Sequence, residues 1–128
     1  MALELRLLVW TVALAFIQML IAVSGATLEF GLPRLAGNRE PPPEPMGWAG
    51  RARRAHVNML ESLVLFAALV LTAVAAQRTS SVTAYGAQLF FWARLVYALV
   101  YLAGIPWLRT GIWGLSVIGL IMIFSQVV

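Results

Sequence analysis

Four long apolar stretches constrain the fold of this chain more than any other feature. They cover residues 5–24, 52–76, 82–104 and 112–128, and each is within the ~17–25 residues that a helix uses to cross a bilayer. Hydrophobic residues make up 62% of the 128-residue chain and charged residues 11%, against roughly 45–50% and 25% in a soluble domain. The sequence therefore predicts an all-α membrane protein, with residues 1–128 forming a single domain that is a four-transmembrane-helix bundle.

The first apolar stretch could be either a signal peptide that is removed or a membrane helix that is retained. Small residues at Ser24-Gly25-Ala26 resemble a signal-peptidase site, which would remove residues 5–24. The preceding segment has no net side-chain charge, however, and the apolar run is longer than the 7–15 residues of a signal core. We expect this stretch to be retained as a membrane helix, in which Gln18 is the notable polar residue.

The connections between the stretches differ in length. Residues 27–50 form the one long connection, and Pro41-Pro42-Pro43-Glu44-Pro45 at its centre predicts a stiff extended loop. Residues 77–81 and 107–111 are short polar segments that predict tight turns. Three glycines at the start of and within the last stretch, Gly111, Gly114 and Gly119, are expected to permit close helix packing.

The distribution of arginine predicts the orientation in the membrane. Only Arg6 and Arg78 lie on the side of the two chain termini, whereas six arginines lie on the side of the long loop. By the positive-inside rule, both termini face away from the cytoplasm and the long loop is cytoplasmic. The six are Arg34, Arg39, Arg51, Arg53, Arg54 and Arg109.

Composition also excludes several kinds of chemistry. The chain has no cysteine, so disulfides and a cysteine nucleophile are excluded, and any thiol must come from a substrate. The sequence contains no metal-ligand cluster, phosphate loop or Ser-His-Asp set in a suitable context. The formal net charge of +4 is explained by topology, because the arginines flank apolar spans, and we expect no nucleic-acid partner.

Polar residues recur along one face of the second span. Arg51, Arg54, Asn58 and Glu61 have spacings of +3, +4 and +3, which place them in a stripe about 80° wide on a helix. His56 is about 140° away from this stripe. We therefore interpret His56 as an interface residue, and the stripe as one wall of a site.

A second polar stripe lies on the third span and consists of Arg94, Tyr97 and Tyr101. In an antiparallel arrangement the two stripes reach matching depths from the loop side and can face each other. A charge near the bilayer centre costs at least ~2.5 kcal/mol, so Glu61 and Arg94 are expected to pair or to line a wet cavity. The pairing would be purely structural, whereas a cavity with Arg109 at its mouth would suit an anionic or zwitterionic ligand.

These residues resemble the signature of the MAPEG superfamily, the membrane-associated proteins in eicosanoid and glutathione metabolism. The resemblance covers most of the chain in length, order of spans and topology. It rests on Arg51-x-x-Arg54-Ala55-His56-x-Asn58-x-x-Glu61 followed by Phe66, on Arg94-x-x-Tyr97-x-x-x-Tyr101, and on Pro106 with Arg109-Thr110.

The resemblance implies a homotrimer that binds glutathione as cosubstrate between neighbouring subunits. Arg109 would stabilise the glutathione thiolate, with help from the Thr110 hydroxyl, for attack on an apolar electrophile or a lipid hydroperoxide. The residues expected to hold glutathione are Arg51, Arg54, Asn58, Glu61, Arg94, Tyr97 and Tyr101.

The sequence also departs from the family pattern. Val57 and Tyr97 stand where the prostaglandin-synthase branch has arginine and histidine, and no arginine occurs at residues 28–31, where many members complete the site of a neighbour. A non-catalytic member of the family is therefore one alternative. A small multidrug-resistance-like transporter is another, although its membrane glutamate would lie in the first span, whereas here Glu61 is in the second.

Overall fold

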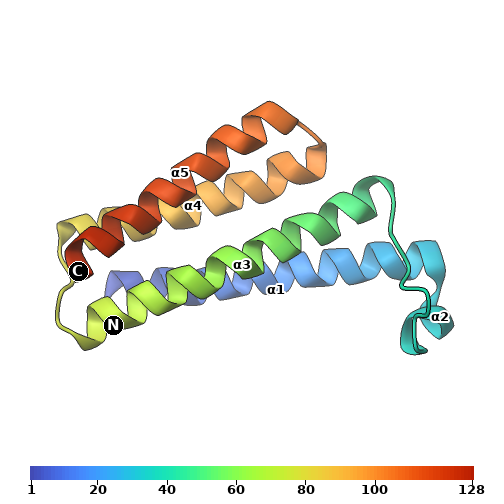
Figure 1. Ribbon diagram of the computed structural model, residues 1–128, viewed down its shortest axis with the longest axis horizontal. Helices are drawn as coiled ribbons and strands as arrows, with labels where there is room; N and C mark the ends of the chain where they lie inside the picture. Colours follow the sequence, from blue (N-terminus) through green and yellow to red (C-terminus); the bar gives the residue numbers. More distant parts are fainter.

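The computed structural model describes residues 1–128 and consists of helices joined by short connections (Figure 1). Four of the helices are long and apolar enough to cross a membrane. The predicted all-α membrane fold with four spanning helices is thus confirmed. The helices are α1 (Leu3–Phe30), the short α2 (Leu32–Ala36), α3 (Gly47–Ala75), α4 (Ser81–Ala103) and α5 (Pro106–Val127).

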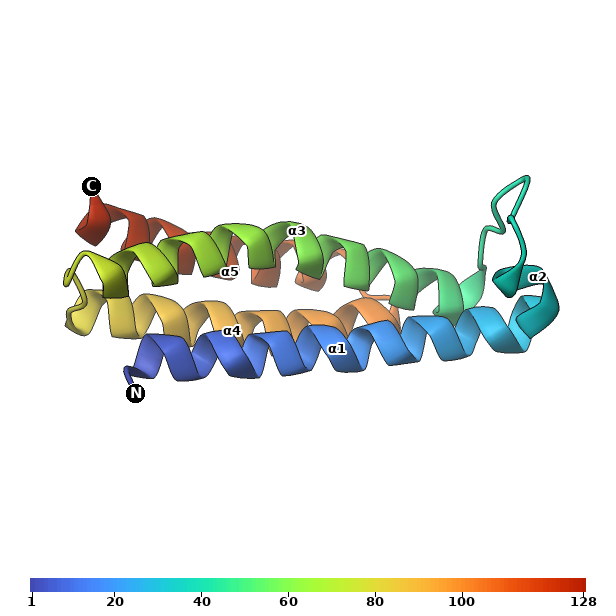
Figure 2. The ribbon, with the colours of Figure 1, turned by 90° about the horizontal axis from the view of Figure 1, so that it is seen from below.

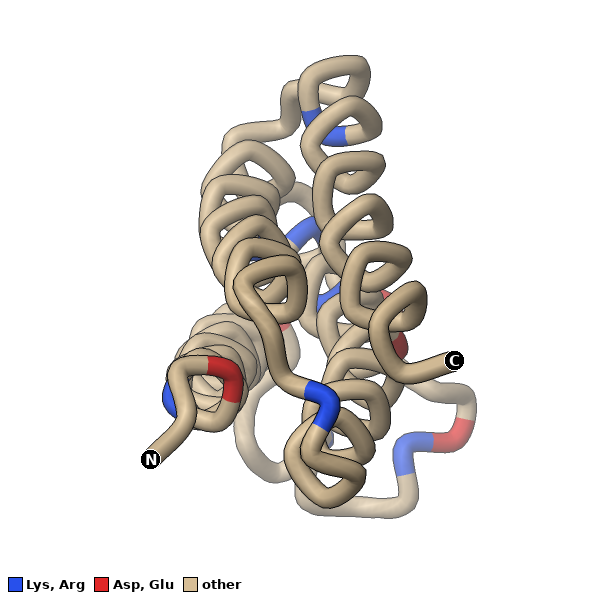
Figure 3. Tube along the Cα trace, turned by 90° about the vertical axis from the view of Figure 1, so that its left-hand side faces the viewer, with Lys and Arg blue, Asp and Glu red and all other residues tan.

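The four long helices form two antiparallel pairs. α1 lies along α3, and α4 lies along α5, as two views of the ribbon show (Figures 1 and 2). Both chain termini lie at one end of the bundle. We call the opposite end, where α3 begins and α4 ends, the arginine-rich end, because it carries Arg51, Arg53, Arg54 and Arg109. Charged positions are sparse along the helices (Figure 3).

The apolar core is best developed toward the end that carries the termini. Phe66 of α3 stacks on Phe90 of α4, with ring centroids 4.1 Å apart, and both side chains are fully buried. Leu7 of α1 and Ile123 of α5 belong to the same buried cluster. All four spanning helices therefore share one core here.

Gly86 of α4 and Gly119 of α5 allow the two helices to pack closely. A Cβ added to Gly119 would lie 2.6 Å from the carbonyl oxygen of Gly86, so neither position admits a side chain without moving a helix. The packing role predicted for Gly119 is confirmed. A Cβ at Gly111 or Gly114 would meet nothing within 4 Å, so neither glycine is needed for packing within the subunit.

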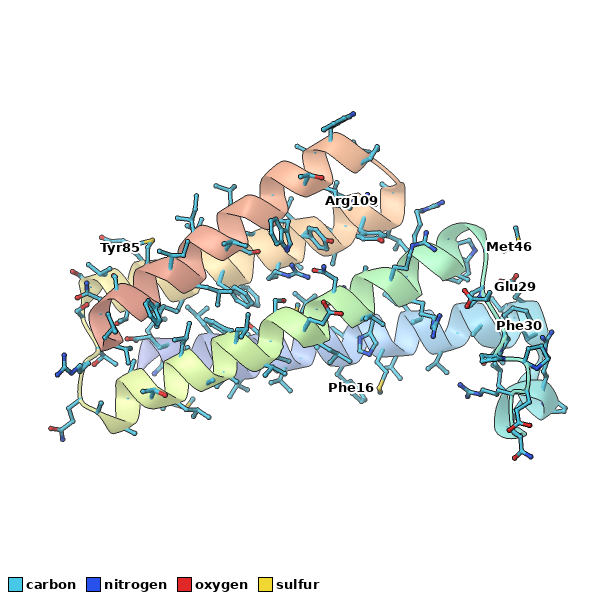
Figure 4. All side chains as sticks on the ribbon, in the orientation of Figure 1. Phe16, Glu29, Phe30, Met46, Tyr85 and Arg109 are labelled. Atoms are coloured by element: carbon cyan, nitrogen blue, oxygen red, sulfur yellow. The ribbon has the colours of Figure 1, made fainter.

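The connections are shorter than the sequence suggested. α1 continues to Phe30 and α3 already begins at Gly47, so the predicted 27–50 loop is reduced to α2 and residues 37–46. Glu29 fixes its end by accepting a hydrogen bond from the Met46 backbone N–H at 3.0 Å, and the two residues lie together in Figure 4.

The turn predicted at residues 107–111 is wrong, because this segment is the first part of α5. Pro106 occupies the start of the helix, where its missing N–H costs nothing. The chain reverses at Gly104, whose φ of +81° is readily adopted only by glycine. The other predicted turn is present and leads to α4, where Ser80 and Thr83 form a capping box.

Candidate functional site

A cavity of about 450 Å³ opens between α3, α4 and α5 at the arginine-rich end. Both predicted polar stripes contribute to its wall. The lining residues are Arg53, Arg54, Val57, Asn58, Glu61, Tyr97, Tyr101 and Arg109.

Arg94 forms the buried support of the cavity. Its side chain is only 1% exposed, and its Nη2 donates a hydrogen bond to Oδ1 of Asn58 at 2.8 Å. The guanidinium carbon lies 4.2 Å from the centre of the Tyr97 ring, a cation–π distance. Arg94 therefore orients one cavity residue from α3 and one from α4 without lining the cavity itself.

The predicted pairing of Glu61 with Arg94 is wrong. Asn58 takes the hydrogen bond from Arg94, and the Nε and Nη1 atoms of Arg94 have no partner. Glu61 is instead exposed on the cavity wall, where water can solvate its carboxylate. This arrangement matches the other expectation, that the membrane glutamate lines a wet cavity.

Two guanidinium groups meet Tyr101 near the mouth of the cavity. The Arg54 Nε donates a hydrogen bond to the Tyr101 hydroxyl at 3.3 Å. The guanidinium of Arg109, labelled in Figure 4, lies over the Tyr101 ring at 4.4 Å from its centre. Tyr101 thus holds one arginine of α3 and one of α5 at the same rim, and the predicted facing of the stripes is confirmed.

Arg51 is placed outside the cavity. Its Nε donates a hydrogen bond to the carbonyl oxygen of Leu102 at 3.0 Å, at the last turn of α4. Such carbonyls have no partner within their helix, and an arginine is a favourable cap for them. Arg51 therefore ties the start of α3 to the end of α4.

Thr110 lines a smaller adjoining hollow of about 210 Å³ together with Asn58, Tyr97, Arg109 and Trp113. Its hydroxyl donates to the carbonyl oxygen of Pro106 at 3.2 Å. Trp113 was not predicted as a site residue, because tryptophans near span ends are ordinarily interface anchors. Its spacing of +4 from Arg109 is the signal that places it on the same face of α5.

A third hollow of about 160 Å³ continues from Asn58 and Glu61 toward the middle of the bundle. Its walls there are mainly apolar and come from α3 and α5. The polar cavity and this mainly apolar groove share Asn58 and Glu61 as wall residues. The groove residues are Ser62, Leu65, Trp113, Ser116, Val117 and Leu120.

Three further basic residues near the site are Arg53, His56 and Arg34. Arg53 lines the cavity although its position is off the stripe, because a long arginine side chain can reach around a helix. His56 does not line the cavity, as predicted, and lies with Arg39 in another hollow that shares Arg53 and Val57 with the cavity. The guanidinium of Arg34 rests over the Phe30 ring at 4.8 Å, so it does not enter the cavity of its own subunit.

The fold and the cavity define a four-helix integral membrane protein with a basic, tyrosine-lined binding site at one end of the bundle. The model of the MAPEG family matches residues 7–128, nearly the whole chain, and the protein belongs to this family. No curated protein and no solved structure matches the chain. Membership supports a role in glutathione-related or eicosanoid metabolism at the membrane.

Proposed function

We propose that this protein is a glutathione-dependent transferase or peroxidase that acts on apolar electrophiles reaching it from the bilayer. One observation carries the proposal: a cavity with Arg54 and Arg109 at its rim shares Asn58 and Glu61 with an adjoining, mainly apolar groove. A site of this shape suits a charged thiol and an apolar acceptor side by side.

The charges of the cavity suit glutathione. This tripeptide has two carboxylates and one ammonium group, and arginine pairs well with carboxylates. Arg53 and Arg54 are available for the carboxylates, and Glu61 for the ammonium group. The cavity volume of about 450 Å³ lies within the ~300–1,000 Å³ that is usual for small-molecule sites.

Arg109 would supply the chemical activation. A free thiol has a pKa of ~8.5 and is mostly protonated at neutral pH. A guanidinium close to the sulfur stabilises the thiolate and lowers the thiol pKa. Tyr101 already holds the Arg109 guanidinium at the cavity rim, and the Thr110 hydroxyl adjoins it.

Two reactions follow from a bound thiolate. In the transferase reaction, the sulfur forms a bond to an electrophilic carbon, and the leaving group departs with its electron pair or the new carbanion takes a proton. In the peroxidase reaction, the sulfur attacks the terminal oxygen of a hydroperoxide and the O–O bond breaks. The alkoxide takes a proton to become an alcohol, and a second glutathione reduces the sulfenic acid to disulfide and water.

The acceptor would lie in the groove along α3 and α5. Leu65, Val117 and Leu120 form its apolar walls, and Trp113 links it to the hollow beside Arg109. A lipid-phase molecule can enter this groove without crossing water. The proposed electrophile is therefore apolar or lipid-like.

The proposed functional unit is a homotrimer with its site on the cytoplasmic side. Arg54 and Glu61 are exposed in the single subunit, so the cavity has an open side that a neighbouring copy can cover. The arginine-rich end also carries most of the arginines that flank the spans, which favours the cytoplasmic orientation with both termini on the other side.

Titration of the purified protein with glutathione tests the proposal. The expected result is binding at millimolar glutathione or below, with thiolate absorbance in the wild type that is lost in Arg109→Ala. Arg39→Ala is the matched control, because Arg39 is a loop arginine outside the cavity. Absence of both binding and thiolate would rule the proposal out.

A non-catalytic role is the second candidate. The last turn of α1 carries Glu29 where an arginine completes the site of many relatives, and Arg34 stacks on Phe30 of its own subunit. A protein that binds glutathione yet forms no thiolate would fit this role. A proton-coupled pump is disfavoured, because the arginines around Glu61 would repel cations, and efflux from proteoliposomes would reveal one.

A further inference from the structure

A further hollow, of about 200 Å³, lies between α1, α3 and α4 near the arginine-rich end. It shares no lining residue with the cavity described above. Nine of its ten lining residues are hydrophobic, and the tenth is Gln18. The hollow exists because α3 and α4 present alanine side chains to it, at Ala52, Ala55 and Ala98.

Gln18 has no hydrogen-bond partner in this apolar setting. Its side chain is 7% exposed, and its Oε1 is buried without a donor. Thr11, the other buried polar residue in the middle of α1, donates to the carbonyl oxygen of Leu7 and is satisfied. A buried amide with no partner is destabilising, so the Gln18 position points to a group that enters the hollow and pairs with it.

Exposed apolar side chains border the hollow. Ile17 and Leu99, on its two flanks, are 53% and 63% exposed on the outer surface of the helices. Leu102, which also lines it, is in the last turn of α4, where its carbonyl accepts from Arg51. The hollow therefore extends from the middle of α1, at Gln18, to the last turn of α4.

We propose that this hollow binds a neutral lipid alcohol, with its hydroxyl group on the Gln18 amide. A primary amide offers both an acceptor and donors, and a hydroxyl matches both. A carboxylate or phosphate is disfavoured because no cationic side chain lines the hollow. An alkyl chain alone would leave the amide unpaired.

The size of the hollow limits how much of the molecule enters. Its volume of about 200 Å³ is below the ~300–1,000 Å³ of sites that enclose a drug-sized ligand. The hydroxyl and the adjoining carbons fill it, and the remainder of the chain lies along α1 and α4 in the bilayer. The occupant is therefore a single-chain or narrow lipid, bound by one end.

Photolabelling of the full-length protein in phosphatidylcholine nanodiscs tests this site. The probe is hexadecanol with a diazirine close to its hydroxyl group, and labelled peptides are identified by mass spectrometry. Labelling is expected in residues 14–21 and 95–102, with competition by unlabelled hexadecanol and not by hexadecane. Equal competition by the alkane would show simple filling by lipid chains and would overturn the proposal.

Gln18→Leu is the decisive variant, because leucine keeps the size and removes the hydrogen bond. Loss of one such bond predicts a fall in hexadecanol affinity of about 3- to 10-fold. Gln126→Leu is the control, since Gln126 lies at the other end of the bundle and should leave labelling unchanged. Unaltered labelling of Gln18→Leu, or labelling only at contacts with a second copy of the chain, contradicts the proposal.

Ala98→Leu provides a second test that does not depend on Gln18. The larger side chain fills the hollow, so labelling of both segments should be lost. Persistence of labelling there would count against the site. The outcome is independent of glutathione binding, which is measured separately at the cavity on the other side of α3.

Discussion

Arg94 of α4 donates a 2.8 Å hydrogen bond to Asn58 of α3, and this bond connects the two halves of the bundle beneath the cavity. The arginine is 1% exposed and within the membrane-spanning part of the chain. Its charge is compensated by Asn58 and by the face of Tyr97, with no carboxylate among its hydrogen-bond partners. Stability and site geometry are thus linked through one side chain.

Asn58→Leu should therefore destabilise the fold as well as the site. The substitution leaves the buried guanidinium with no hydrogen-bond acceptor, and a hydrogen bond to a charged group is typically worth ~1.5–3 kcal/mol. The thermal midpoint of the purified protein in detergent should fall by several degrees. Asn38→Leu, in an exposed loop position, serves as the control, and an equal fall in both variants would argue against the role of Arg94.

The Gly86–Gly119 contact predicts opposite effects for two similar substitutions in α5. Gly119→Ala places a Cβ 2.6 Å from a backbone oxygen, so the α4–α5 pair must separate and stability should fall by ~1–3 kcal/mol. Gly114→Ala meets nothing within 4 Å and should stabilise the helix slightly, by up to ~1 kcal/mol. Thermal unfolding of both variants checks the pair, and a similar response would contradict the packing role of Gly119.

Much of this architecture was predictable, because span length and helical spacing are local properties of a sequence. The +3 and +4 spacings placed Asn58 and Tyr97 on facing surfaces, and Arg94 contacts both. The interaction of Arg94 with Asn58 in place of Glu61 was not predictable. It depends on how closely α3 and α4 approach at each depth, which side-chain spacing does not determine.

The spacing of polar residues also does not predict where each helix ends. Hydropathy marks where a chain leaves the membrane, and helices can continue past that point, as α1 does to Phe30. The hollow beside Gln18 depends on three helices together, so one helical face could not reveal it. The position of Arg53 in the cavity wall was not predictable for a related reason, since spacing describes the backbone position and not the reach of a long side chain.

Arg51 and Arg54 should respond differently to alanine, although both belong to the same stripe. Arg51 bonds the Leu102 carbonyl outside the cavity, so Arg51→Ala should lower stability by about 1 kcal/mol with little change in glutathione affinity. Arg54→Ala removes a cavity arginine and should weaken glutathione binding about 10-fold or more. Calorimetric titration and thermal unfolding separate the two effects, and a large affinity loss in Arg51→Ala would place it in the site.

Glu61 should recognise the amino group of glutathione. Glu61→Gln keeps the shape and removes the charge, so the affinity for glutathione should fall about 10-fold. A glutathione analogue that lacks the amino group should bind the wild type and the variant equally. If the variant loses affinity for both ligands to the same extent, Glu61 has another role.

The pH dependence of turnover should reveal Arg109. If its guanidinium lowers the pKa of the bound thiol, the wild-type rate rises with pH through that lowered pKa and is level above it. In Arg109→Ala the thiol pKa returns toward ~8.5, so the rising limb moves to higher pH and the activity loss is largest near neutral pH. Below the thiol pKa, the rate falls about 10-fold for each unit by which this pKa rises.

Initial rates with a chromogenic apolar electrophile between pH 6 and about 9.5 measure the shift, and the profile of Arg109→Lys is expected to lie between those of the wild type and Arg109→Ala. A profile of unchanged shape, merely scaled down, would mean that Arg109 binds glutathione without activating its thiol.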